Sequence, residues 1–280
     1  MKMSVFTIRL FLLWGLTNLI ILKGMSEEGT ETRLAPELVE RFEPLTLRIQ
    51  TSVSKNPIPF QARLLKPNNL EKRQLYPLIV SLHGAWERGN DNQRQLKYLP
   101  QQMAQSYWRE KYPCFLLAPQ CPLMINWSST ANSLESAEDN EQNLLDQIHE
   151  MIQDVSSKYP IDKRRIYITG YSMGGFGTWS MIARYPNTFA AAVPICGGGN
   201  TDTVSRFLHL PIWVAHGDAD QVVPVTGSRA MVDTFRNMGG VPIYKELQGV
   251  NHDSWTQTYE DSNGMMAWLF QQRKTSKGLP

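Results

Sequence analysis

The chain has 280 residues, 42% of them hydrophobic, and a formal net charge of +2 at neutral pH. Its 28 basic and 26 acidic residues are interspersed, which excludes the concentrated basic face of a nucleic-acid-binding protein. No internal repeat, low-complexity tract or Pro/Gly/Ser-rich linker divides the chain, so its length predicts one domain with a single sizeable core.

The first expected element is an N-terminal leader, residues 1–26. Two basic residues precede an apolar run at 10–22, and G-M-S at 24–26 offers small residues for cleavage. An apolar run of about 13 residues is too short to cross a bilayer comfortably, so a secretory signal peptide is favoured over a membrane anchor. A secreted or periplasmic location follows. The alternative is translation from Met25, which would make the protein cytoplasmic.

Strand-like and helical segments alternate along the rest of the chain. Residues 45–51 and 60–65 predict an antiparallel hairpin. Further strands are expected near residues 77–82, 114–119, 165–169, 190–196, 211–215 and 243–247. Helical stretches are expected near residues 91–108, 135–158, 173–185, 226–238 and 254–273. This alternation predicts an α/β fold, a mostly parallel sheet covered by helices on both faces.

The strand expected at 77–82 is a near-continuous apolar run, which is typical of a strand covered on both faces, and it leads into H-G-A-W-E-R-G at 83–89. We expect His83 to brace this loop by hydrogen bonds. Glu87 and Arg88 have two interpretations: a solvated ion pair that contributes little, or a role in shaping the loop.

A strand, a tight turn and a helix follow one another directly at residues 165–184. The turn reads G-Y-S-M-G, and this order is the signature of a nucleophile elbow, which pushes a serine hydroxyl out at the end of a sheet. Side chains at Gly170 and Gly174 would collide with the neighbouring strand and helix. Ser172 is therefore the candidate nucleophile.

A serine hydroxyl needs a base to remove its proton and a carboxylate to orient that base. Carboxylates are available in H-G-D-A-D-Q-V-V-P at 216–224, where Asp218 and Asp220 both follow a buried strand. His252 is the one histidine that comes after both this loop and Ser172. The other four are expected to have structural or surface roles: His83, His149, His209 and His216.

These motifs give the chain a recognisable resemblance. It is similar to α/β-hydrolases of the carboxylesterase, feruloyl-esterase and polyhydroxybutyrate-depolymerase-like group, whose relatives are also labelled predicted peptidases or phospholipase/carboxylesterases. The resemblance covers about residues 45–270. It is carried by L-H-G-A-W-E-R-G, A-P-Q-C-P, G-Y-S-M-G-G-F-G-T-W, V-P-I-C-G-G-G, H-G-D-A-D-Q-V-V-P and N-H-D-S-W.

The resemblance implies an α/β-hydrolase fold without a cap domain. Residues 45–273 then form the catalytic domain, after the leader at 1–26 and an N-terminal extension at 27–44. Caps are commonly inserted between the strands expected at 190–196 and 211–215, but the connection there is only about fourteen residues long. An open cleft is expected.

The resemblance also assigns roles. It favours Asp220 over Asp218 as the catalytic acid, because related hydrolases place the acid at the second position of H-G-x-x-D-x-x-V-P, and it gives the triad order Ser172, Asp220, His252. The oxyanion hole is expected from the backbone N–H of Met173 and one from Ala85 or Trp86.

Tryptophans are expected around the cleft. Position 86 is usually glycine in such loops, so Trp86 leaves two alternatives: an altered loop, or an indole that roofs the acyl pocket. Trp127 and Trp255 are expected on the rim as substrate contacts, since indoles stack on sugars or aromatic acyl groups. Core packing is an equal alternative for Trp255. Trp179 and Trp213 are expected in the core, as is Trp268.

The leading hypothesis is a serine carboxylesterase that acts on a small-molecule or polymer-borne ester. The alternatives are a prolyl-oligopeptidase-like serine peptidase and a non-catalytic binding protein of the same fold. No metal-ligand spacing or phosphate-binding glycine loop occurs, so no cofactor and no metal are expected. The sequence leaves the oligomeric state open.

Overall fold

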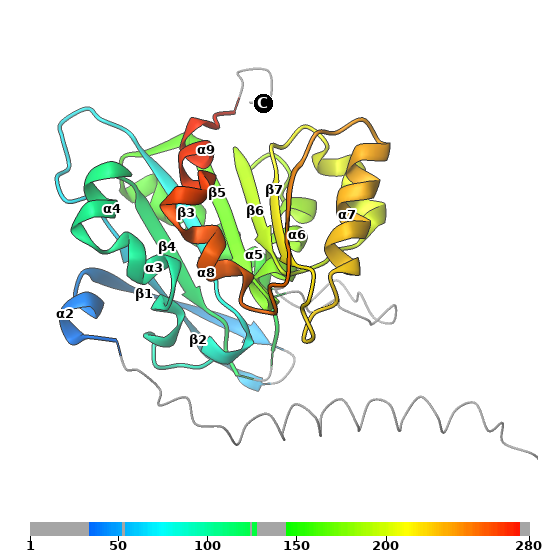
Figure 1. Ribbon diagram of the computed structural model, residues 1–280. Coiled ribbons are helices and arrows are strands. Elements are labelled where there is room, and N and C mark those ends of the chain that lie inside the picture. Colours follow the sequence, from blue (N-terminus) through cyan, green and yellow to red (C-terminus); the bar gives the residue numbers. More distant parts are fainter. Residues whose placement is uncertain (1–33, 52–53, 124, 128–143, 275–280) are drawn as a thin grey trace, which may run out of the picture. The chain divides into compact units, whose positions relative to one another are not determined.

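One eight-stranded sheet, in the order β1-β2-β4-β3-β5-β6-β7-β8, runs through the folded unit at residues 34–280. The computed structural model describes residues 34–51, 54–123, 125–127 and 144–274 (Figure 1). The expected leader at 1–26, and residues 27–33 of the expected extension, lie outside this part.

The strands match those predicted. β1 and β2 form an antiparallel hairpin, β2 pairs antiparallel with β4, and the six strands from β3 to β8 are parallel. The first strand begins at Phe42, a few residues earlier than expected. The bounds are β1 Phe42–Thr51, β2 Ser54–Leu65, β3 Tyr76–Leu82, β4 Phe115–Gln120, β5 Ile161–Tyr171, β6 Ala191–Ile195, β7 Trp213–Gly217 and β8 Ile243–Leu247.

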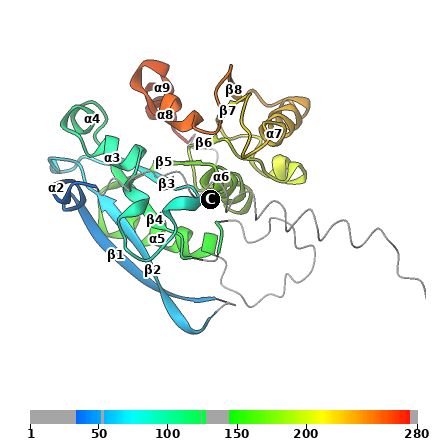
Figure 2. The ribbon, with the colours of Figure 1, turned by 60° about the horizontal axis from the view of Figure 1, so that its bottom comes forward.

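Helices cover both faces of the sheet, as Figure 2 shows. One apolar cluster joins the sheet to α5 (Leu144–Lys158), α6 (Met173–Arg184), α7 (Thr226–Asn237) and the 3-10 helix η4 (Thr201–Phe207). The other joins it to α2 (Pro36–Val39), α3 (Leu99–Met103), α4 (Ser106–Lys111), α8 (Ser254–Tyr259) and α9 (Met265–Gln271). β3 and β4 are buried along their whole length, which explains why nearly all of their residues are apolar.

Two of the predicted helices are broken into shorter ones. The stretch expected at 91–108 contains η3 (Arg94–Leu96), α3 and α4, and the chain turns at Tyr98, whose φ of 60° no helix accommodates. The stretch expected at 254–273 is interrupted at Gly264, with φ 75°, between η5 (Asp261–Asn263) and α9. Of the helix expected at 135–158, residues 144–158 are described and helical.

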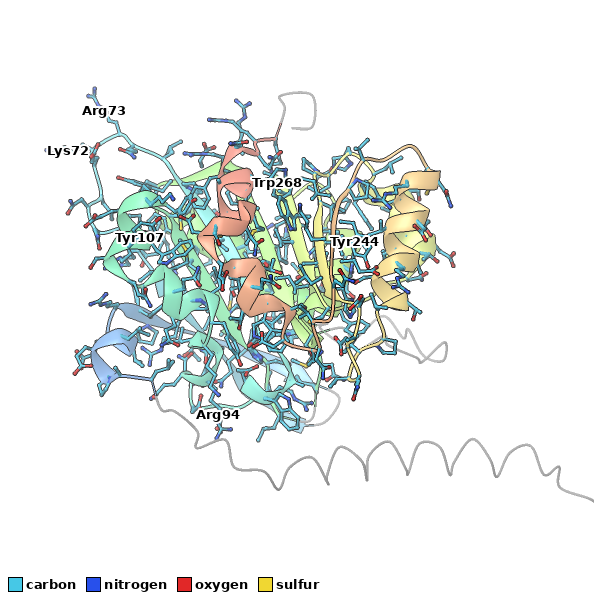
Figure 3. All side chains as sticks on the ribbon, in the orientation of Figure 1. Lys72, Arg73, Arg94, Tyr107, Tyr244 and Trp268 are labelled. Carbon is cyan, nitrogen blue, oxygen red and sulfur yellow. The ribbon has the colours of Figure 1, made fainter. Side chains whose placement is uncertain are left out.

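The β8 edge of the sheet carries polar and charged side chains. Tyr244, labelled in Figure 3, donates a hydrogen bond to Glu246 Oε2 at 2.6 Å, and Arg229 of α7 donates to both carboxylate oxygens. These hydrogen bonds, that from Arg229 first, lower the pKa of Glu246 to about 2. Charged side chains on an edge strand discourage pairing with another chain.

Candidate active site

Ser172 lies between β5 and α6 in a backbone conformation with φ 54° and ψ −120°. Few non-glycine residues adopt positive φ, and a residue held there is characteristic of a tightly constrained turn. A Cβ on Gly174 would lie 2.0 Å from the Leu82 carbonyl oxygen, and one on Gly170 would lie 2.3 Å from the Gly174 oxygen. The turn therefore packs directly against the end of β3, as the elbow interpretation predicts.

His252 and Asp220 meet Ser172 at the carboxyl edge of the sheet. His252 Nε2 lies 3.0 Å from Ser172 Oγ, and its Nδ1 lies 2.8 Å from Asp220 Oδ2. The His252 side chain is 17% exposed and that of Asp220 is fully buried. The three residues follow β5, β7 and β8, and parallel strands present their carboxyl ends on one edge. This arrangement can pass a proton from a serine hydroxyl to an imidazole.

Asp220 is held as an acceptor on both oxygens. Its Oδ1 accepts from the amides of Val222 and Val223 at 2.8 and 2.9 Å, while Oδ2 faces His252. Burial raises the pKa of Asp220, but the hydrogen bonds from His252 and the two amides outweigh it, and the pKa is lowered. Asp218, the rival acid, instead accepts from the Gly249 amide at 2.7 Å.

The N–H groups that are expected to form the oxyanion hole lie at the first residues of two helices. Met173 is the first residue of α6, and Ala85 is the first residue of the 3-10 helix η2 (Ala85–Glu87). N–H groups in the first turn of a helix have no acceptor within that helix. Trp86 is absent from the residues with positive φ in the described chain, so the tryptophan needs no glycine-like conformation there. Its side chain is 66% exposed.

Two buried side chains brace the loop at 83–92. His83 Nδ1 lies 2.6 Å from the Gly84 oxygen, and its Nε2 accepts from the Cys121 amide at 2.9 Å. Gln120 donates to the oxygen of Glu87 and to Asp91 Oδ1, and it accepts from the amide of Asn92 at 2.7 Å. The brace expected from His83 is therefore present.

Comparison with known proteins places this site in a family. A sequence profile described as Phospholipase/Carboxylesterase matches residues 114–267, more than half of the chain. The protein belongs to this family. The solved structure of a thermostable esterase is 38% identical and superposes with a TM-score of 0.76, covering 85% of this chain and 64% of the esterase.

Two curated relatives of this phospholipase/carboxylesterase family member act on polymers, according to their names. Poly(3-hydroxyalkanoate) depolymerase C of Paucimonas lemoignei is 31% identical over 42% of this chain and 36% of the relative. The bifunctional acetylxylan esterase/xylanase XynS20E of Neocallimastix patriciarum is 24% identical over 63% of this chain and 24% of the relative. The matched region thus spans about a third or less of each relative.

The fold expected from the resemblance is confirmed for this family member. The sheet and its helices form an α/β-hydrolase, and the connection between β6 and β7, where caps are commonly inserted, holds only η4. Among the described residues, none of the helices combines the length and the hydrophobicity needed to span a bilayer.

The expectation that Trp127 lines the rim is wrong. Trp127 is fully buried, its Nε1 donates to the His83 oxygen at 2.9 Å, and its Cβ lies 2.6 Å from where a Cβ on Gly177 would be. The indole packs edge-on against His83, with ring centroids 4.9 Å apart, and its Cβ lies against α6 at Gly177. Trp255 is 8% exposed and lies edge-on to His252, with ring centroids 5.2 Å apart, which matches its packing alternative.

Glu87 and Arg88 do not form the solvated ion pair. Glu87 is 3% exposed and lies near Gly84 and the Tyr171 ring, and burial raises its pKa. Arg88 Nε instead donates to the Ala85 oxygen at 2.9 Å. Both residues shape the loop that carries the expected oxyanion donors.

The remaining tryptophans and histidines lie largely where they were expected. Trp179 and Trp213 are buried, and Trp268 (Figure 3) packs partly buried against Trp213. His209 is exposed and bonds the Pro186 oxygen. His149 is half-buried and stacks on Tyr185.

For two residues the sequence alone does not predict a role at the site. Gln120 braces the loop and His216 contacts Asp220 Oδ2 at 3.2 Å. The position of His216 beside a buried strand predicts only a structural role, although it opens the same H-G-x-x-D motif that ends in Asp220. Gln120 stands within A-P-Q-C-P, but nothing local to that motif indicates partners some thirty residues upstream.

One group of possible metal ligands lies at the site. In the described part of the chain, the sulfur of Cys196 gathers with ligand atoms of Asp220 and His252 within 4.8 Å of one another. Burial raises the pKa of Cys196 to about 12, so its thiol stays protonated at neutral pH, whereas metal ligation needs the thiolate. The Cys196 sulfur accepts instead from the Ser172 amide at 3.2 Å. These contacts fit a proton relay better than a metal centre.

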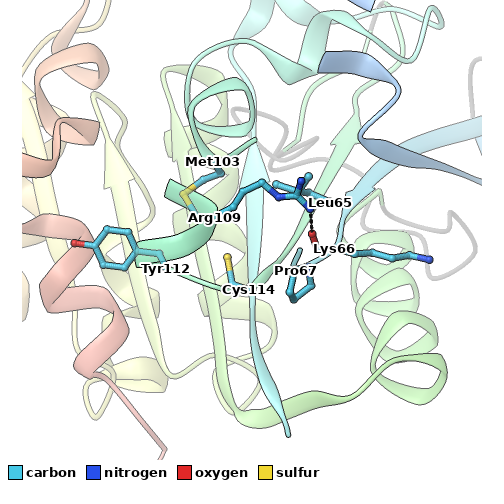
Figure 4. Close-up of a pocket in the computed structure, with 7 residues that line it drawn as sticks. All are labelled: Leu65, Lys66, Pro67, Met103, Arg109, Tyr112 and Cys114. Carbon is cyan, nitrogen blue, oxygen red and sulfur yellow. Dashed lines mark hydrogen bonds between the residues drawn. The ribbon is translucent and has the colours of Figure 1, made fainter. Parts of the chain in front are cut away.

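A small hollow elsewhere in the fold has no part in this site (Figure 4). It lies near Cys114, which precedes β4 and so belongs to the opposite edge of the parallel strands from Ser172. Arg109 crosses it and donates to the Lys66 oxygen at 2.8 Å.

Proposed function

We propose that this protein is a serine esterase that cleaves carboxylic esters through Ser172, His252 and Asp220. The observation that carries the proposal is the continuous pair of contacts, 3.0 Å from Ser172 Oγ to His252 Nε2 and 2.8 Å from His252 Nδ1 to Asp220 Oδ2. Membership of the phospholipase/carboxylesterase family supports the same chemistry.

The reaction then proceeds in two halves. Ser172 Oγ attacks the ester carbonyl while His252 Nε2 takes its proton, and Asp220 stabilises the imidazolium that forms. The N–H of Met173 and one from Ala85 or Trp86 meet the oxyanion. His252 returns the proton to the departing alcohol, leaving an acyl group on Ser172. Water, deprotonated by His252, attacks the acyl carbonyl, and the bond from this carbon to Ser172 Oγ breaks. His252 returns the proton to Ser172 Oγ as the acid leaves.

The substrate we propose is a bulky or polymer-linked ester. The residues Trp86, Leu123 and Val222 are each more than 60% exposed, and they stand in the loops after β3, β4 and β7 at the edge that carries Ser172. The short β6–β7 connection leaves this edge without a cap from that position. Two relatives with polymer substrates in their names point the same way.

Turnover of p-nitrophenyl acetate by Ser172→Ala tests the chemistry. We expect kcat to fall by at least about 10⁴-fold, since removing a triad nucleophile leaves only binding and oxyanion stabilisation. Ser205→Ala, an exposed serine in η4, is the matched control and should retain wild-type kcat. Wild-type turnover by Ser172→Ala would refute the proposal.

Two further assays separate the alternatives. Faster cleavage of aminoacyl anilides than of nitrophenyl esters would favour the peptidase. Absence of a fluorophosphonate adduct on Ser172 in the folded protein would favour a binding protein. For the substrate, acetylated xylan, methyl ferulate and short polyesters should be compared with nitrophenyl esters of graded chain length.

We also propose a secreted or periplasmic location, on the basis of the basic residues and apolar run at the start of the sequence. N-terminal sequencing of the protein from fractionated cells tests it. A mature chain that starts near residue 27 outside the cytoplasm is expected. A cytoplasmic chain that starts at Met25 would contradict it.

A further inference from the structure

A second imidazole faces the same oxygen of Asp220 as the candidate base. His216, at the end of β7, is fully buried, and its Nε2 lies 3.2 Å from Asp220 Oδ2 and 3.0 Å from the Val223 oxygen. A carboxylate and a carbonyl are both acceptors, so Nε2 carries a proton and donates. Burial lowers the pKa of His216, which favours the neutral ring.

The opposite edge of this ring, at Nδ1, is hydrogen-bonded to another element of the fold. His216 Nδ1 lies 2.8 Å from Ser228 Oγ, and Ser228 Oγ lies 2.8 Å from the Gly197 oxygen. In the neutral ring with Nε2–H, Nδ1 and the Gly197 oxygen are both acceptors, so they share the single proton of the Ser228 hydroxyl in a three-centre hydrogen bond. Ser228 belongs to α7 and Gly197 follows β6, so two separate elements fix the ring in place.

The two oxygens of Asp220 are held in different ways. Oδ1 is fixed by the amides of Val222 and Val223, which belong to the same short turn as Asp220. Oδ2 is the oxygen that faces His252 Nδ1. It accepts hydrogen bonds from two side chains, those of His252 and His216. Without His216, Oδ2 would keep His252 as the one direct donor that the described residues give it.

We propose that His216 is a positioning residue for the reaction, and this inference rests on the proposed esterase function. Its Nε2–H holds Asp220 Oδ2 in line with His252 Nδ1, so that the base keeps the tautomer with a free Nε2 facing Ser172. His216 touches no reacting atom and acts through Asp220 alone.

A matched pair of variants isolates the Nε2 donor. The amide nitrogen of glutamine is as many bonds from Cβ as histidine Nε2, whereas that of asparagine reaches only as far as Nδ1. We expect His216→Asn to lower kcat for p-nitrophenyl acetate about tenfold with KM unchanged, the effect of one lost hydrogen bond to a charged group. His216→Gln should stay within about threefold of wild type.

A spectroscopic readout accompanies the kinetics. The proton shared by His252 Nδ1 and Asp220 should give a downfield proton resonance in wild type and His216→Gln, and that resonance should be weakened or lost in His216→Asn. Thermal unfolding shows that the variants are folded, and His209→Asn, which is exposed and outside the site, is the control expected to match wild type.

The outcomes distinguish the two proposals. Wild-type kcat in His216→Asn, or an equal loss in both His216 variants, overturns the positioning role. Full activity in Ser172→Ala overturns the esterase proposal itself. Should His216→Asn not fold, Ser228→Ala carries the test, because it removes the anchor of Nδ1 and leaves the imidazole. We expect kcat to fall about threefold there, and an unchanged kcat contradicts the inference.

Discussion

At the scale of single residues, His83 shows how a buried imidazole can hold a loop without carrying charge. It is 1% exposed, and both ring nitrogens are engaged, Nδ1 with the Gly84 oxygen and Nε2 with the Cys121 amide. Nε2 accepts and therefore has no proton, which fixes the tautomer. Burial lowers the pKa of His83 to about 4 from an ordinary 6.5.

This shift makes folding depend on pH. The unfolded chain takes up the proton first, so the stabilisation by neutral His83 is present above about pH 6.5 and is lost as the pH falls towards 4. Between pH 7 and pH 4.5 we expect the free energy of unfolding to drop by about 2–3 kcal/mol through this residue. Urea unfolding of wild type and His83→Gln at both pH values measures it.

Glutamine is the suitable comparison because its side-chain oxygen can accept from the Cys121 amide and does not titrate. Other groups, His216 among them, titrate equally in both proteins, so the difference between the two pH dependences belongs to His83. The same pH dependence in both proteins would show that His83 is not buried as the neutral form.

At the scale of elements, the loop at 83–92 depends on a side chain from the next strand. Gln120, at the end of β4, bonds the Glu87 oxygen, Asp91 Oδ1 and the Asn92 amide. The Glu87 oxygen and the Asn92 amide would lose this partner if the side-chain amide were removed, and unpaired buried polar groups are costly. Asp91 Oδ1 would keep the amides of Gln93 and Arg94. Gln120 therefore links the β3 and β4 ends into one rigid rim beside Ser172.

Replacing Gln120 with leucine tests this link. We expect the free energy of unfolding to fall by about 3 kcal/mol and kcat to fall about tenfold, because the loop that carries the oxyanion donors loses its fixed position. Faster chymotrypsin cleavage after Trp86 should accompany the change. Gln257→Leu, an exposed glutamine in α8, is the control. Unchanged proteolysis and activity in Gln120→Leu would rule out the brace.

The elements also show what a sequence can predict. Strand positions follow from apolar runs that are buried on both faces, as in β3 and β4, and the elbow follows from glycines whose backbones touch Leu82 and one another. The direction of Trp127 does not follow, because it is decided by a carbonyl 44 residues upstream. The positive φ at Tyr98 does not follow from its own residue type, although Pro100 two residues later is a signal that a new helix begins there.

At the scale of the whole molecule, topology brings the site together. Ser172 and His252 are 80 residues apart, yet both lie at carboxyl ends of parallel strands in one sheet. Such a site exists only while the sheet and its two covering layers are intact. Stability and the geometry of the site should therefore be lost in the same transition, if the folded unit unfolds cooperatively.

The three cysteines lie in different parts of the fold, so their reactivity can test whether it unfolds cooperatively. Cys114 and Cys196 belong to the apolar cluster with α3 and α8, and Cys121 belongs to the cluster on the other face. All three are unpaired and buried, and burial raises the pKa of each to about 12. A thiol reagent attacks the thiolate, so in the native protein all three are protected twice, by exclusion of the reagent and by the scarcity of the thiolate.

We therefore expect a thiol reagent such as Ellman's reagent to label none of the cysteines at pH 8 in native buffer, and all three at the urea concentration that abolishes esterase activity. Mass spectrometry of the labelled peptides identifies each site. Because Cys121 belongs to the other apolar cluster, early labelling of Cys121 alone would show that its layer opens separately. Early labelling of Cys114 without Cys196 would show local opening at the strand edge opposite Ser172. A single shared transition means that both layers and the site form one cooperative unit.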